Sequence, residues 1–187
     1  MEIASRVALA IDHAAVDRIV SDLVRLRERH GRLFFFGAGG SAANCSHAVN
    51  DFRKLCGIDA IAATDNVAEV TARVNDDGWE TVFESHLRTS RAADPDAVFV
   101  LSVGGGDLAR NISVGIIRGI EQAKRQRMKV YGIVGREACY TKSAGDEVIV
   151  IPVPDAALLT PLAEAFQAIV WHAIVSDPRL AIHPTTW

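Results

Sequence analysis

The chain has 187 residues, of which 49% are hydrophobic and 23% are charged, and its formal net charge at pH 7 is −3. This length is enough for one compact domain with a substantial core, and the composition is that of an ordinary folded protein. The small negative charge excludes the strongly basic surface on which non-specific nucleic-acid binding depends, so we expect no nucleic-acid partner.

The N-terminal segment from Ile3 to Arg29 is predicted to be one helix, because its apolar residues recur at helical spacing. An apolar stripe that stands before the first strand needs a surface to cover it. That surface is either its own domain or a partner subunit, and the sequence alone does not choose between them.

Short apolar runs then predict five strands. The runs are Leu33–Phe36, Ala60–Ala62, Ala97–Leu101, Val130–Val134 and Val148–Ile151. Helices are predicted around them, near residues 42–54, 67–74, 79–91, 108–127 and 158–175. This alternation predicts an α/β fold with a parallel sheet that helices cover on both faces. Ligands of such sheets bind beyond the carboxyl ends of the strands.

A glycine-rich loop, Gly37-Ala38-Gly39-Gly40-Ser41, directly follows the first predicted strand and leads into a helix. Glycines let the backbone approach a ligand closely, and the free amides of a helix N-terminus favour an anion. The alternative is a tight turn in which Ser41 only caps the helix. A turn alone rarely needs three glycines, so we favour the binding loop.

A second glycine-rich loop, Ser102-Val103-Gly104-Gly105-Gly106-Asp107, also lies between a predicted strand and a predicted helix. Neither loop is followed by the Gly-Lys-Ser/Thr of a P-loop, and the first does not have the spacing of a dinucleotide fingerprint. The two loops together therefore predict a phosphate site that is not a nucleotide site of either common type.

Imidazoles and carboxylates share helix faces at two places. His47 and Asp51 are four residues apart on the helix after the first loop, and Glu164 and His172 are eight apart on the last helix. Such groups suit divalent-metal ligation or acid–base catalysis. A solvated or internally paired polar face is the alternative interpretation of each pair.

The three cysteines, Cys45, Cys56 and Cys139, form no CxxC pair and are odd in number. This argues against a disulfide framework and is typical of a reducing compartment. The N-terminus lacks a signal-peptide pattern, and no apolar run approaches the roughly 20 residues of a membrane span. We therefore expect a cytoplasmic protein with no membrane partner.

These motifs resemble the phosphoheptose isomerases, which are single-domain proteins of the sugar isomerase (SIS) family. The resemblance is carried by the segment Gly37–His47, the triplet Thr64-Asp65-Asn66 and the acidic Asn75-Asp76-Asp77, and it extends over nearly the whole chain. It implies a three-layer sandwich with a five-stranded parallel sheet as a single domain over residues 1–187. It also implies a homotetramer, with the N-terminal helix (residues 1–30) at a subunit interface.

The activity that the resemblance implies is an aldose–ketose isomerisation in heptose biosynthesis. Members convert sedoheptulose 7-phosphate to a glycero-manno-heptose 7-phosphate, so the expected partner is a sugar phosphate. The same family includes a relative that binds the replication initiator protein. The alternative function is therefore a non-catalytic SIS module that binds a sugar phosphate, a protein partner, or both.

The resemblance also implies residue roles. Asp51 falls on the catalytic base and His172 on the catalytic histidine. The metal ligands would be His47, Asp51, Glu164 and His172, with zinc as the expected divalent ion. The substrate contacts would be Gly39, Gly40, Ser41, Asp65, Ser102, Gly104, Gly105 and Glu164.

The chain departs from the family pattern at both sites. The second loop of the family usually reads Ser-x-Ser-Gly-Asn-Ser, so Gly104 and Asp107 stand where the family has phosphate-binding serines. In the metal site Asp51 replaces a glutamate and Glu164 replaces a glutamine. Two helix turns, about 12 Å of rise, separate Glu164 from His172. We therefore expect an altered phosphate site, and a metal site that lies between these two residues or is shared by subunits.

Overall fold

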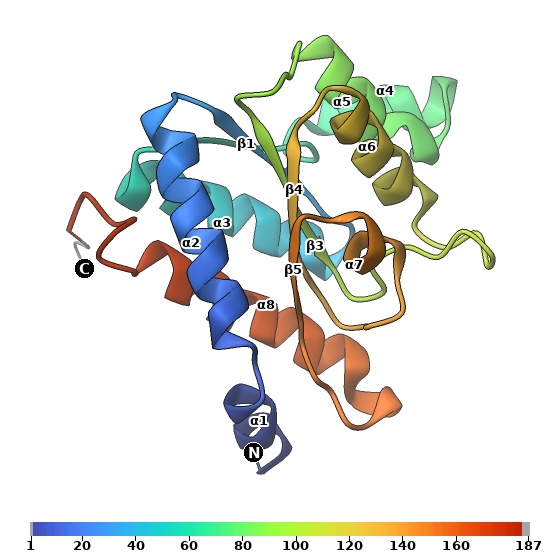
Figure 1. The fold of residues 1–187 in the computed structure, drawn as a ribbon. Coiled ribbons are helices and arrows are strands. Elements are labelled where there is room, and N and C mark those ends of the chain that lie inside the picture. Colours follow the sequence, from blue (N-terminus) through green and yellow to red (C-terminus); the bar gives the residue numbers. More distant parts are fainter. Residues whose placement is uncertain (1, 185–187) are drawn as a thin grey trace.

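The computed structural model describes residues 2–184 and contains one five-stranded sheet, in the order β2-β1-β3-β4-β5, with every neighbouring pair parallel (Figure 1). The strands are β1 (Arg32–Phe36), β2 (Asp59–Ala62), β3 (Ala97–Ser102), β4 (Lys129–Val134) and β5 (Glu147–Val150). All five were predicted, and each bound differs from the prediction by at most one residue. Because the chain crosses from β2 over β1 to β3, the loops after β1 and β3 open side by side, where ligands bind in sheets of this kind.

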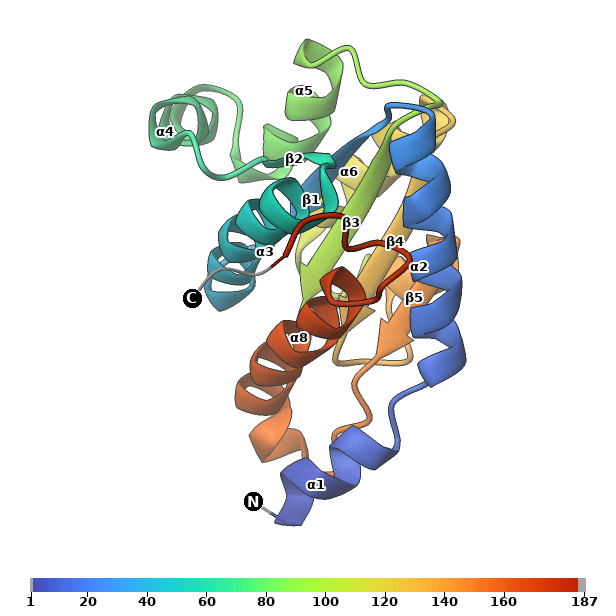
Figure 2. The same cartoon turned by 90° about the vertical axis from the view of Figure 1, so that its left-hand side faces the viewer.

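Helices cover both faces of the sheet, which confirms the predicted three layers (Figures 1 and 2). One face carries α2 (His13–Glu28), α3 (Gly40–Cys56) and α8 (Leu159–Val175), with α1 (Glu2–Leu9) joining the same core through Val7. The other face carries α4 (Val67–Asp76), α5 (Val82–Thr89), α6 (Val114–Arg125) and α7 (Tyr140–Ala144). Short 3-10 turns, η1 (Trp79–Thr81) and η2 (Ala156–Leu158), precede α5 and α8.

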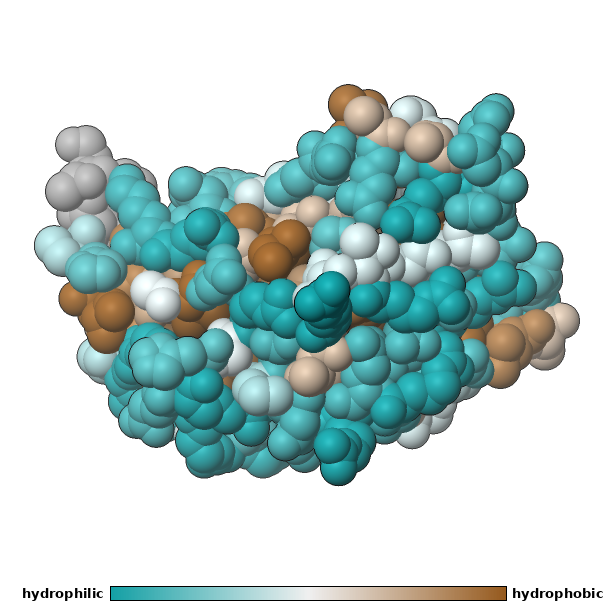
Figure 3. All heavy atoms as spheres, turned by 90° about the horizontal axis from the view of Figure 1, so that it is seen from above, coloured by the Kyte–Doolittle hydropathy of each residue, from teal (hydrophilic) through white to brown (hydrophobic). Residues whose placement is uncertain are grey.

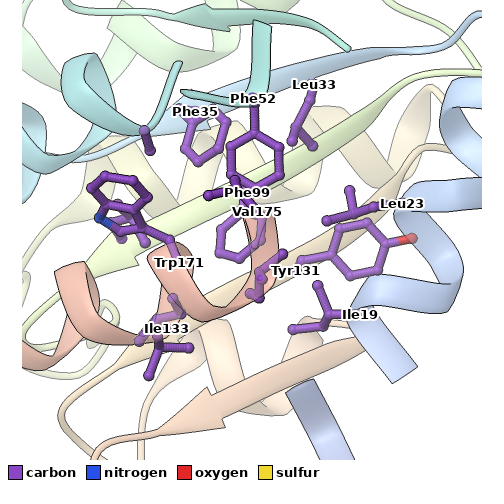
Figure 4. Close-up of a cluster of buried hydrophobic side chains, with 14 of the residues drawn as sticks. Ile19, Leu23, Leu33, Phe35, Phe52, Phe99, Tyr131, Ile133, Trp171 and Val175 are labelled. Atoms are coloured by element: carbon purple, nitrogen blue, oxygen red, sulfur yellow. The ribbon is translucent and has the colours of Figure 1, made fainter. Parts of the chain in front are cut away.

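The alternation of strand side chains divides the core in two. Phe35 and Phe99 point toward α3 and α8, where their rings stack at 5.3 Å between centroids, and Phe52 of α3 packs on Phe35 at 5.4 Å (Figure 4). Phe34 and Phe36 point to the other face, as the two-residue period of a strand requires. A fully buried Trp171 ties α8 to the first of these cores. The sheet therefore holds α3 and α8 rigidly side by side.

The N-terminal prediction was wrong in one respect, because residues 2–28 form two helices and not one. The side chain of Asp12 accepts a hydrogen bond from the backbone N–H of Ala15 at 3.1 Å, and so begins a new helix after a break. The apolar stripe of α2 packs on its own sheet and is mostly buried, with Val16 and Val24 only partly covered. Leu9, at the end of α1, is 82% exposed. The N-terminal interface helix stays a prediction, and the exposed apolar side chain of this region is Leu9 of α1.

The helix predicted from residue 108 begins only at Val114. Residues 107–112 form a loop that is closed by two backbone hydrogen bonds between Asp107 and Ile112, each of 3.0 Å. Helix α7 was not predicted, because it has five residues and no apolar periodicity. The loop after β3 is therefore longer than the sequence pattern indicated.

The segment Ala156–Val175 is long and apolar enough to cross a membrane by length and composition, contrary to our expectation that no segment is. In the fold, its Phe166, Val170 and Trp171 are buried against the sheet. The core helix of a soluble protein passes the same test, so this composition is weak support for a membrane span. In the view from above, hydrophobic residues form patches between hydrophilic ones (Figure 3).

Candidate functional site

The first glycine loop opens directly into α3 at the carboxyl end of β1. Gly39 has a φ of 61°, and a Cβ built on it would meet no atom within 4 Å, so open space lies beside this residue. Ser41 is 2% exposed, and its hydroxyl oxygen accepts a hydrogen bond of 3.1 Å from Nε2 of Gln167 on α8. Since the oxygen already accepts, its own O–H is left to donate elsewhere.

Glu164 lies over the start of α3. A Cβ on Gly40 would meet the Glu164 carboxylate, so the carboxylate in this position lies directly against the backbone of Gly40. Asn44 holds the backbone nearby, because its Nδ2 donates to the Glu164 carbonyl oxygen at 2.9 Å and to Gln167 Oε1 at 3.0 Å. A carboxylate beside the N-terminus of a helix is electrostatically favourable. The first loop therefore already holds an anionic side chain.

Helices α3 and α8 bring three ligand-type side chains together. Donor atoms of His47, Asp51 and His172 all lie within 4.8 Å of one another, and Asp51 Oδ2 is 3.6 Å from His172 Nε2. Trp171 supports both imidazoles, with ring centroids 4.8 Å from His47 and 3.5 Å from His172. We call these three residues the triad. Helical spacing had predicted the His47–Asp51 pair, the family resemblance had implied His172 as a further ligand, and the fold brings these three together.

The hydrogen bonding of His172 shows what the triad can hold. Its Nδ1 lies 2.7 Å from the carbonyl oxygen of Ala168. A carbonyl only accepts, so Nδ1 carries a hydrogen, and in the neutral ring Nε2 then has a lone pair that faces the Asp51 carboxylate. A cation placed between these two atoms would interact favourably with both. A histidine whose other nitrogen donates to a carbonyl is also typical of metal ligands, so the residues fit a divalent ion.

Glu164 is not brought to this group. Its carboxylate lies at Gly40, while His172 is two turns further along α8, about 12 Å away in helix rise. Within residues 2–184, the donors that cluster closely enough to share one ion are the triad alone. Glu164 as a fourth ligand stays a prediction that the geometry of a single chain does not satisfy.

Asp65 lies between β2 and α4, close to α3, since the Ser46 hydroxyl donates to its carboxylate. Two residues of the triad lie further along the same helix, and the third, His172, faces them from α8. His47 is six residues and Asp51 ten residues after Ser41, which corresponds to about 9 and 15 Å of rise. One chain thus places its loops at the carboxyl edge of the sheet and its triad midway along α3.

The second glycine loop is held by its own serine. Ser102 is buried, and its Oγ accepts a hydrogen bond of 3.0 Å from the backbone N–H of Gly105. Gly105 has a φ of 67°, and a Cβ there would collide with Cys139. A Cβ on Gly104 would meet nothing within 4 Å. Ser102 thus stabilises the loop and keeps its own O–H as a donor, and its contact with a ligand stays a prediction.

Asp107 is paired with Arg110 within the second loop. Its carboxylate accepts from the backbone N–H of Arg110 at 3.0 Å and from the Arg110 guanidinium at 2.7 Å. These bonds lower the pKa of Asp107. The residue that directly precedes α6 is Ser113, and the sequence prediction missed it as the start of this helix. The signal was available, because Ser113 directly precedes the apolar run at Val114.

The chain is similar to proteins of one kind in both sequence and fold. It is 29% identical to the probable phosphoheptose isomerase of Thermoplasma volcanium over 181 residues, which cover 94% of this chain and 87% of that protein. It is 25% identical to the phosphoheptose isomerase of Helicobacter pylori strain 26695 over 86% of this chain and 80% of that protein. No protein-family model matches the chain.

Among solved structures, the phosphoheptose isomerase of Neisseria gonorrhoeae aligns with a TM-score of 0.79 at 22% identity, over 92% of this chain and 89% of that one. At this identity the match shows the fold alone. It confirms the expected sandwich with a parallel five-stranded sheet and N-terminal helices.

Proposed function

Because the chain belongs to the SIS family, with phosphoheptose isomerases as its relatives over nearly its whole length, we propose that it is a sugar-phosphate isomerase. The reaction would convert sedoheptulose 7-phosphate, or a close relative, to a glycero-manno-heptose 7-phosphate. The observation that carries the proposal is the triad of His47, Asp51 and His172 in a chain with glycine loops at the switch point of the sheet. These are the acid–base groups that such an isomerisation needs.

The proposed chemistry is a proton transfer between neighbouring carbons. A carboxylate removes a proton from C1 of the ketose, which gives an enediol, and a proton is then delivered to C2. We assign the base to Asp51, which is half-buried, and the proton transfers at the sugar oxygens to His172, which is exposed. If Asp51 is committed to a metal ion, Glu164 takes over as base, because its carboxylate lies beside the first loop.

We infer that the triad holds a divalent metal, with zinc as the ion that two imidazoles and one carboxylate favour. His47, Asp51 and His172 would be its ligands. When bound there, such an ion supplies polarisation of a carbonyl oxygen. Metal analysis of the purified protein tests this, and His47→Ala should lower the metal content because one of three ligands is lost. A metal-free preparation with full turnover would remove the ion from the mechanism.

We further propose that the site is completed by a second subunit of a homotetramer. The triad lies on the outer face of α3 and α8, and Ile169, on the same helix as His172, is 53% exposed. A neighbouring copy that packs on this face would bring its loops to the triad and cover the apolar surface. Light scattering that returned the mass of a single chain at micromolar concentration would contradict this.

We also infer a cytoplasmic location, which the three free cysteines support, since they form no disulfide in the structure.

The isomerase proposal is tested by incubating the protein with a panel of ketose phosphates and following aldose formation. We expect turnover on sedoheptulose 7-phosphate. If the protein binds this ligand but converts none of the panel, the non-catalytic binding module becomes the better account.

A further inference from the structure

A chain of buried hydrogen bonds joins α3 and α8 beneath the first glycine loop. Gln167 is fully buried, and both ends of its amide are engaged. Its Oε1 accepts a hydrogen bond of 3.0 Å from Nδ2 of Asn44, and its Nε2 donates to the hydroxyl oxygen of Ser41 at 3.1 Å. We call Asn44, Gln167 and Ser41 the relay.

A backbone carbonyl sets the direction of every hydrogen bond in the relay. Nδ2 of Asn44 also donates to the carbonyl oxygen of Glu164 at 2.9 Å. Because a carbonyl oxygen only accepts, Asn44 has to turn its NH₂ group, with two hydrogens, toward α8. Gln167 then presents its oxygen to Asn44 and its NH₂ group to Ser41. Neither amide titrates, so this order does not change with pH.

The relay leaves the Ser41 hydroxyl with a hydrogen to donate. Its oxygen accepts from Gln167, and within residues 2–184 no group of the chain accepts a hydrogen bond from its O–H. Ser41 is almost fully buried, so water has little access to this donor. A buried donor without an acceptor is unfavourable, and an oxygen of a ligand that enters the first loop would satisfy it.

The first loop has one open side for such a ligand. The Glu164 carboxylate lies against Gly40, whereas the space beside Gly39 is free for at least 4 Å around an added Cβ. The open side is therefore two residues before Ser41 in the same loop.

We propose that Gln167, held by Asn44, is a positioning residue that keeps the Ser41 hydroxyl as a hydrogen-bond donor to an oxygen of the substrate. The assignment rests on the proposed function and adds two residues to it, Gln167 and Asn44, that neither helical spacing nor the family resemblance had marked. The relay makes the first loop selective for a ligand that offers a lone pair at this point.

The test uses the full chain and two substitutions that disturb the relay in different ways. Gln167→Met keeps the size of the side chain and removes both of its hydrogen bonds. Asn44→Asp keeps the shape, but a carboxylate at this half-exposed position is ionised near neutral pH and only accepts. Gln167 then has to turn its NH₂ group to that carboxylate and its oxygen to Ser41. The Ser41 hydroxyl would donate inward and offer the ligand only lone pairs.

Each substitution is made in the wild type and in Ser41→Ala, which completes a double-mutant cycle. The Kd of sedoheptulose 7-phosphate is measured by calorimetry, kcat and KM are measured on the same compound, and urea titration gives the stability of each variant. The control is Gln122→Met. Gln122 is also a buried glutamine with hydrogen bonds, to Arg125, but it lies on α6 at the other face of the sheet.

We expect Gln167→Met and Asn44→Asp each to raise Kd and KM by about 3- to 10-fold, the range for one hydrogen bond. Asn44→Asp should have the larger effect, because it reverses the direction of the relay. The value of kcat should change little, because this bond is made equally in the ground state and the transition state. In Ser41→Ala, either substitution should change Kd by less than about 2-fold, because the hydroxyl through which it acts is absent. Gln122→Met should bind like wild type.

The proposal is overturned if Gln167→Met lowers stability but leaves Kd unchanged, which is the result of a purely structural hydrogen bond. It is also overturned if Asn44→Asp raises Kd equally with and without the Ser41 hydroxyl, because the added negative charge alone would do so. Either result with normal turnover leaves the isomerase intact and removes only the relay. Conversely, the full cycle in Kd without any turnover keeps the relay and removes the isomerase.

Discussion

The two glycine loops start from similar sequences and reach different structures. In the first, α3 begins at once, and a buried network from Gln167 and Asn44 fixes Ser41 and the backbone at Glu164. In the second, the chain makes a further excursion through Asp107 and Ile112 before α6 begins. The first loop holds a carboxylate of its own, and the second leaves an open position at Gly104. A glycine-rich loop therefore indicates that another group can come close to the backbone. The side chains around the loop determine which group that is.

The largest effect should come from the triad. Asp51→Asn keeps the shape of the side chain but cannot accept a proton, so kcat should fall by at least about 100-fold, the lower range for acid–base catalysis. His172→Ala should have a similar effect. Glu164→Gln is the matched variant at the first loop. If Glu164→Gln abolishes turnover while Asp51→Asn retains it, the catalytic base is Glu164, beside the first loop, and not Asp51 of the triad.

Removal of the hydrogen bonds that Gln167 makes under the first loop should destabilise the folded protein. Gln167 is fully buried, and Gln167→Leu removes its hydrogen bonds to Ser41 and Asn44 at similar volume. We expect the free energy of unfolding to fall by about 1–3 kcal/mol, because polar partners are left unsatisfied. Urea titration measures this. An unchanged midpoint would show that the first loop does not depend on α8.

Two neighbouring glycines test the second loop. Gly105→Ala requires an Ala at positive φ and a Cβ in the place of Cys139, so unfolding free energy should drop by at least about 1–2 kcal/mol. Gly104→Ala meets open space and should change stability by less than about 1 kcal/mol. Equal losses in the two variants would contradict the described conformation of this loop.

Most of the sheet could be predicted from the sequence because buried parallel strands are continuous apolar runs, as in Val130–Val134. Local signals also existed where the helix predictions were wrong, since Asp12 and Ser113 are both residues that favour helix starts. They were outweighed by the longer apolar periodicity around them.

The site could be predicted only in part. Periodicity puts His47 and Asp51 on one face, but only the packing of α3 on α8 brings His172 to them. The contact of Glu164 with Gly40 joins residues far apart in sequence and leaves no local pattern.

The smallest effect concerns His86 on α5, away from both loops. Burial lowers its pKa, and its Nε2 is buried with no partner among the described residues. In the unfolded chain the His86 imidazole has a pKa of about 6.5, so as the pH falls it takes up a proton in the unfolded state before it does so in the folded state. The contribution of neutral His86 to the free energy of unfolding should therefore be complete above that pH and be lost as the pH falls toward the lower pKa of the folded state. Urea unfolding midpoints at pH 7.5 and 5.5 measure this loss of stability. The difference between the two midpoints should be smaller in His86→Leu. His13→Gln, at an exposed histidine, is the control.

The central claim is that this chain isomerises a ketose phosphate by proton transfer through an enediol. Conversion of sedoheptulose 7-phosphate in D₂O, followed by NMR, tests it most directly. We predict aldose product with deuterium at C2, because a proton held by an enzyme carboxylate exchanges with solvent before it is delivered. Product that forms without deuterium would show that the transferred hydrogen does not exchange with solvent, and the absence of any product would contradict the isomerase itself.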